Sequence, residues 1–251
     1  MDGKNITENL EPGRYETSGF DVTFSIRWRI TAQLVLGAEL FARKAQEIEE
    51  RNGLVDSVDE ETLTEYRAYI VSVIMQAVAA LESQAWEILH YGPGSHLSSS
   101  EVNRKFACYN QILHSRLGSS GANEIDRKEV LARYNCILSL LNKTMFEKGK
   151  QPYQNSQLLI DLRNHLVHYK SESVKLEEGG PEDTKLDKKF RSLGLETSPY
   201  TPSSATFSQK VLSASCASWA VKSTINFIDE FYRRLEIDSP LKPYESRLHI
   251  H

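Results

Sequence analysis

The chain has 251 residues, of which 40% are hydrophobic and 25% are charged; its formal net charge is −4 and its pI is about 6.0. This composition is typical of a soluble globular protein that is long enough to bury a sizeable core. It excludes a protein whose whole surface is basic, so any site for nucleic acid must be a local basic pocket.

Targeting, redox and cofactor signals are absent from the sequence. The three cysteines, Cys108, Cys136 and Cys216, have neither disulfide nor metal-site spacing, which favours a reducing compartment. Residues 1–14 lack the apolar core of a secretory signal, and the least charged run, residues 68–81, is shorter than the roughly 20 residues that span a bilayer. We therefore expect a cytoplasmic protein without membrane contact, cofactor or bound metal.

The N-terminal region differs in pattern from the rest. Residues 1–18 are polar and turn-rich, which predicts a flexible arm, and residues 19–251 are expected to form a single domain. Between residues 20 and 30, apolar and polar side chains alternate, which predicts a half-buried strand. A modest partner for that strand is offered by Leu248 and Ile250 near the C-terminus.

Helical patterns dominate after residue 30. An apolar stripe at helical spacing runs from Ile30 to Ile48, and residues 51–53 (Arg-Asn-Gly) form a helix stop. Ser57 and Glu60 fit a capping box for a second helix that runs to about residue 90. Its middle is apolar on nearly all sides, which places it at the centre of a bundle.

Three further helices are predicted before residue 170. Ser98 and Glu101 cap a third helix that ends at Gly118 and is followed by a Ser/Gly loop. A fourth helix is expected over residues 125–147, and Pro152 suits the first turn of a fifth.

Residues 171–206 break the helical pattern because they are polar and rich in Pro, Gly and Ser. This composition predicts an exposed, flexible insertion, with a short helical piece over residues 186–193. A last long helix is predicted over residues 207–237, with an apolar arc facing the core. The fold class expected is thus mainly α, a helical bundle of five or six substantial helices with an N-terminal strand.

The fifth predicted helix carries the most concentrated chemistry. Its buried face is predicted from apolar residues at helical spacing, namely Leu158, Leu159, Leu162 and Leu166. At about 100° per residue, Asn164 and His168 stand one turn apart on another face. The long side chain of Arg163 can reach that face over the helix surface.

The run from Arg163 and Asn164 to His168 resembles the Arg-polar-x-x-x-His motif of HEPN domains, which are all-helical modules of bacterial toxins, antiphage systems and RNA-processing proteins. The resemblance is specific over these six positions and general, as a helical plan, over most of the chain. It implies a HEPN-like domain that forms a homodimer with its motif helices near the two-fold axis. RNA, or a protein partner such as an antitoxin, would be its ligand.

The resemblance also implies a reaction and residue roles. HEPN ribonucleases promote attack of a ribose 2′-hydroxyl on its own phosphate without metal, which leaves a 2′,3′-cyclic phosphate and a 5′-hydroxyl end. His168 would be the general acid or base, because an imidazole titrates near neutral pH. Arg163 would hold the phosphate and stabilise its developing charge, and Asn164 would orient the histidine or the substrate.

Three neighbouring residues are candidate RNA contacts. His165 lies off the line of Asn164 and His168, so it is either structural or a secondary contact. Some HEPN toxins have a tyrosine two residues after the histidine, where a partner nucleotidyltransferase modifies it. Here Lys170 occupies that position and Tyr169 directly follows His168, which argues against such regulation. Lys170 is either a phosphate contact or a solvated cation near a helix end.

A structural interpretation stands beside the catalytic one: an inert HEPN-like module in which Arg163 braces helices by pairing with Asp161 or Glu82. Glu82 either orients Arg163 from the second helix or is simply the first exposed residue after a buried stretch. The acidic pI and the shifted tyrosine favour the inert module, whereas the intact motif favours the enzyme. The basic cluster of residues 185–191 is nearly cancelled by neighbouring acids, which favours a solvated loop over a phosphate site.

Overall fold

The computed structural model describes residues 15–17, 20–22, 30–53, 58–91, 100–168, 185–202 and 205–248. Its strands are β1 (Tyr15–Thr17) and β2 (Phe20–Val22). Its helices are α1 (Thr31–Asn52), α2 (Glu60–Tyr91), α3 (Ser100–Asp126), α4 (Val130–Leu140), α5 (Tyr153–Val167), α6 (Lys185–Ser192), α7 (Phe207–Lys210), α8 (Ala214–Leu235) and the 3-10 helix η2 (Lys242–Arg247). The protein is mainly α-helical, as the sequence predicts.

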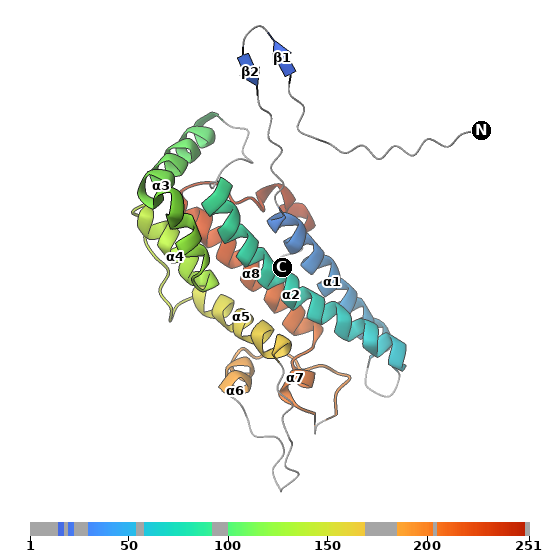
Figure 1. The fold of residues 1–251 in the computed structure, drawn as a ribbon. Coiled ribbons are helices and arrows are strands. Elements are labelled where there is room, and N and C mark those ends of the chain that lie inside the picture. The colour runs from blue at the N-terminus through green and yellow to red at the C-terminus, as the bar shows by residue number, and fades with distance from the viewer. Residues whose placement is uncertain are drawn as a thin grey trace, which may run out of the picture.

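Helix α2 lies at the centre of the bundle. It packs against α1 and α8, which run beside it in Figure 1, and also against α3, α4 and α5. Its apolar residues are fully buried on several sides, including Ile70, Ile74, Leu81 and Ile88. The central position predicted from an all-round apolar pattern is therefore confirmed.

A buried carboxylate links α2 to the start of α1. Glu87 is 3% exposed and accepts hydrogen bonds from the backbone N–H groups of Ile30 at 2.8 Å and Thr31 at 3.2 Å. These N–H groups have no partner within α1, and a carboxylate at a helix N-terminus satisfies them while interacting favourably with the helix dipole.

The ends of α2 and α3 differ from the prediction. Ser57 lies outside the described residues. Helix α2 begins at Glu60, directly after Asp59, whose carboxylate accepts the N–H of Thr62 at 2.8 Å. Helix α3 continues through Gly118 to Asp126, so the predicted stop is wrong. One glycine costs a helix only about 1 kcal/mol, and apolar packing around Ile125, which is buried, offsets that.

Helix α4 is shorter than predicted at both ends. It begins at Val130 and ends at Leu140, after which Asn142 takes a left-handed conformation with φ 55°. Asparagine tolerates that conformation better than most residues. The side chain of Asn135 then holds the following loop, accepting the N–H of Phe146 at 2.8 Å and donating to its carbonyl at 3.1 Å.

The second half of the predicted insertion is packed, not exposed. The short helix predicted over residues 186–193 is confirmed as α6, and its Phe190 is buried against Phe207 and Trp219. Tyr200 is also buried and meets the ring of Tyr66 edge-to-face at 4.9 Å. Aromatic anchors spaced among polar residues explain why composition alone was misleading. The first half, residues 169–184, lies outside the described residues.

The last predicted helix is divided into α7 and α8. Ser213 begins α8 and accepts the N–H of Cys216 at 3.1 Å, while the Glu49 carboxylate accepts the N–H of Ala214 at 2.9 Å. The apolar arc of α8 is buried as predicted, with Cys216, Trp219, Ala220, Phe227 and Phe231 all facing the core. Leu212 precedes the helix.

The alternating N-terminal run forms only a short described strand. Its first residues make up β2, which pairs antiparallel with β1 so that Tyr15 lies opposite Val22. Leu248, half of the predicted partner, directly follows the 3-10 helix η2 and belongs to none of the described strands. Ile250 and residues 1–14, 18–19 and 23–29 lie outside the described residues.

By length and composition alone, residues 60–90 of α2 are apolar enough to cross a membrane, and no other helix in the described ranges is. Half of the most apolar window is buried inside the bundle, as in the core helix of a soluble protein. The structure is therefore compatible with a soluble protein.

Candidate functional site

The candidate site lies on the C-terminal half of α5, whose apolar face fixes the helix on the bundle. Leu158, Leu159 and Leu162 are buried, and Leu166 is partly buried. Helix α5 packs against α2, α4, α6 and α8, and it begins directly after Pro152, as predicted. Because this stripe is anchored, the remaining faces of α5 present the polar residues of the motif at defined positions.

Arg163 forms an ion pair with Glu82 of α2 through one terminal nitrogen. The arginine side chain is 24% exposed and the glutamate side chain 41%, so the pair lies at the edge of the bundle. The Nε of Arg163 is buried and has no hydrogen-bond partner among the described residues. The guanidinium is therefore held by Glu82 through one terminal nitrogen, while its Nε is shielded from solvent and the side chain as a whole is partly exposed.

Asp161, the other carboxylate predicted as a possible partner of Arg163, makes contacts with different residues. It accepts a hydrogen bond from Gln157 at 3.0 Å and lies 3.8 Å from the Nζ of Lys189 on α6. Of the two predicted partners, the structure thus places Glu82 against the arginine.

Asn164 and His168 are both exposed, one helical turn apart. The backbone N–H of His168 donates to the carbonyl of Asn164 at 2.9 Å, and His168 is the C-cap of α5. Exposure of both side chains leaves them accessible to a large polar substrate.

His165 faces a different neighbour. One of its ring nitrogens, Nε2, lies 2.8 Å from the hydroxyl of Ser208, and its ring packs edge-to-face on Phe207 with centroids 5.7 Å apart. Both partners belong to α7. These contacts favour the structural interpretation of His165, and no spacing in the sequence signals them, since Ser208 lies 43 residues away. Tyr169 and Lys170 lie outside the described residues.

Helix α6 brings basic residues beside the motif helix. Figure 1 shows α6 and α7 next to the C-terminal half of α5, and α5 contacts α6 directly. The basic residues, for which neighbouring charges favoured a solvated loop over a phosphate site, therefore stand on the predicted short helix, which packs against α5. Sequence reasoning missed this placement because it depends on buried Phe190, whose partners are distant in the chain.

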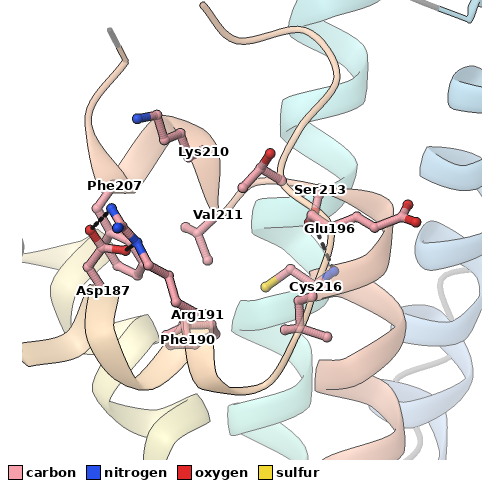
Figure 2. Close-up of a pocket in the computed structure, with 11 residues that line it drawn as sticks. Asp187, Phe190, Arg191, Glu196, Phe207, Lys210, Val211, Ser213 and Cys216 are labelled. Atoms are coloured by element: carbon pink, nitrogen blue, oxygen red, sulfur yellow. Dashed lines mark hydrogen bonds and ion pairs between the residues drawn. The ribbon is translucent and has the colours of Figure 1, made fainter. Parts of the chain in front are cut away.

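A small pocket opens between α6, α7 and the start of α8 (Figure 2). Phe190 and Phe207 form part of its wall, Arg191 and Lys210 lie at its edge, and Cys216 lies deeper. Burial raises the pKa of the Cys216 thiol to about 12, so this sulfur stays protonated at neutral pH and is a poor nucleophile. The pocket therefore adds no reactive group to the α5 site.

Comparisons with protein-family models, with curated proteins and with solved structures find no match to this chain. The part of the chain that the structure describes contains no group of three or more His, Cys, Asp or Glu side chains suited to a metal ion.

Proposed function

We propose that the chain is a metal-independent endoribonuclease of the HEPN type, which acts in the cytoplasm as a toxin or an antiphage effector. The observation that carries this proposal is the arrangement on α5. Asn164 and His168 are exposed one turn apart, and the partly exposed guanidinium of the neighbouring Arg163 is held by Glu82 through one terminal nitrogen.

In the proposed reaction, His168 removes the proton from a ribose 2′-hydroxyl as that oxygen attacks the adjacent phosphorus. The bond from phosphorus to the 5′-oxygen breaks, and that oxygen takes up a proton from water, which leaves a 5′-hydroxyl end. The guanidinium of Arg163 binds the non-bridging oxygens and stabilises the charge that accumulates on them. Asn164 orients the imidazole or the substrate, and Glu82 positions Arg163.

One arginine and one histidine are few groups for a reaction that removes a proton from the 2′-hydroxyl and delivers one to the 5′-oxygen. We therefore propose a homodimer in which the two α5 helices lie near the two-fold axis and form a composite site. Light scattering at micromolar concentration should report twice the mass of the chain; a monomer alone would count against the composite site.

The ion pair between Arg163 and Glu82 and the contact between His165 and Ser208 favour a second candidate. Both connect α5 to neighbouring helices, as a brace would. In that case the chain is an inert HEPN-like module that binds RNA or a protein partner such as an antitoxin.

Expression in a bacterial host distinguishes the two candidates. The enzyme should slow growth, and His168→Ala should restore it at equal protein level, whereas the inert module should give equal growth for both. His90→Ala serves as a control, because it removes an imidazole that pairs with Asp126 and lies outside the α5 site; it should slow growth as wild type does if the chain is the enzyme.

A further inference from the structure

Helix α6 separates its charged and apolar residues cleanly. At about 100° per residue, Lys185, Lys188 and Lys189 fall within an arc of roughly 100°, and all three are exposed. Leu186 and Phe190 lie on another side, where both pack against the core. The buried aromatic therefore fixes which side of α6 faces outward.

The outward side has a local charge opposite to that of the whole chain. Four basic residues and one acidic residue give the eight residues of α6 a net charge of +3, against −4 for the full sequence. Arg191 is paired with Asp187 at 2.9 and 3.0 Å, as Figure 2 shows, so these two charges offset each other. What remains is the face formed by Lys185, Lys188 and Lys189, here called the lysine face.

The lysine face is held next to the motif helix. The Nζ of Lys189 lies 3.8 Å from Asp161 on α5. At about 100° per residue, Asp161 points to the same side of α5 as Asn164 and His168. Phe190 also packs on Phe207, the ring that contacts His165. Direct contacts thus tie α6 to α5 on the side where the candidate site lies.

We propose that the lysine face of α6 binds the phosphate backbone of single-stranded RNA beside the α5 site. This proposal rests on the proposed function, since it assigns a binding surface to the same substrate. From Lys185 to Lys189 the helix rises about 6 Å, and a stacked strand rises about 3.4 Å per nucleotide, so the three lysines match up to three successive phosphates. Lysines bind phosphates as point charges and do not read bases, so the contact positions the strand without selecting its sequence.

The test measures binding of the full chain to a fluorescent 2′-O-methyl oligoribonucleotide, which lacks the attacking hydroxyl and cannot be cleaved. The variant K185Q/K188Q/K189Q removes the lysine face. The control K128Q/K148Q/K150Q makes the same change of charge at exposed positions near the other end of α5. Thermal melting of both variants should match wild type, because every substituted side chain is exposed.

Three phosphate contacts to a single strand contribute a slope of about 2 to the dependence of log affinity on log salt. Between about 50 and 200 mM salt, wild type should therefore lose about 16-fold more affinity than the α6 variant. The control should keep the wild-type slope. The proposal would be overturned if wild type and the α6 variant had equal salt slopes, or if the α6 and control variants lost equal affinity for RNA. It would also be overturned if poly-glutamate displaced the labelled strand as well as unlabelled RNA does.

The binding result is independent of catalysis. If the α6 variant loses affinity but wild type cuts no RNA, the lysine face stands and the nuclease proposal fails. If wild type cuts RNA but the α6 variant binds unchanged, the lysine face fails and the nuclease proposal stands.

Discussion

The ion pair between Arg163 and Glu82 makes a quantitative prediction that separates positioning from bracing. Exposed ion pairs contribute about 0.2–1 kcal/mol, whereas breaking a fully buried pair costs about 3–5 kcal/mol. The two side chains are 24% and 41% exposed, which places this pair near the exposed class. We expect a coupling free energy of about 1 kcal/mol, equivalent to a change of about 2–4 °C in Tm for a chain of this size.

The perturbation is a double-mutant cycle of Glu82→Gln, Arg163→Ala and the combined variant, followed by chemical denaturation. The exposed pair of Lys44 and Glu47 on α1 provides a control cycle, in which the coupling should be smaller. A coupling of about 3 kcal/mol or more would show that Arg163 is mainly a buried brace. A coupling of zero would contradict the expected contribution of this pair to stability.

Three further predictions concern the scaffold. Ser213→Ala removes the N-cap of α8 and should lower the free energy of unfolding by about 1–2 kcal/mol, measured by denaturation against the exposed control Ser115→Ala. In the folded protein at mildly alkaline pH, a thiol reagent should modify exposed Cys108 but not Cys216, because burial shields Cys216 and raises its pKa. Mass spectrometry of the modified peptides measures this, and fast labelling of Cys216 would contradict its burial. Burial also raises the pKa of Asp229 above its ordinary value of 3.8, because the buried carboxyl is more stable in its protonated form. The protonated group therefore stabilises the folded state fully below pH 3.8, and this stabilisation is lost as pH rises through the folded-state pKa. Asp229→Asn should therefore raise Tm, relative to wild type, more at neutral pH than at a pH of about 3.5, and an equal change at both would contradict this.

Much of the fold could be predicted because local patterns and global packing agree there. The all-round apolar run of α2 placed it at the centre, and the arc of α8 faces the core as its spacing predicts. The end of α3 was misjudged because Gly118 is a strong local signal whose cost is small beside tertiary packing. The short helix within residues 185–202 was predicted, but its packing on the core was not, because Phe190 and Tyr200 are held by partners far away in the chain.

The candidate site divides in the same way. Helical spacing alone puts Asn164 and His168 on one face, and the structure shows both exposed. No local pattern decides whether Arg163 meets Glu82 or Asp161, because that choice depends on how α5 crosses α2. The contact of His165 with α7 likewise depends on a chain connection of more than 40 residues.

RNA cleavage by the Arg163 and His168 variants tests the central claim most directly. Wild type, Arg163→Ala, His168→Ala and the double variant are each incubated with mixed-sequence RNA in EDTA, and the fragment ends are analysed. Wild type should produce 2′,3′-cyclic phosphate and 5′-hydroxyl ends, and each single variant should be slower by about 10²–10⁴-fold. The double variant should be little slower than either one, because groups that act in one transition state are non-additive. No cleavage by wild type, cleavage that requires added metal, or cleavage that persists in the double variant would contradict the proposed mechanism.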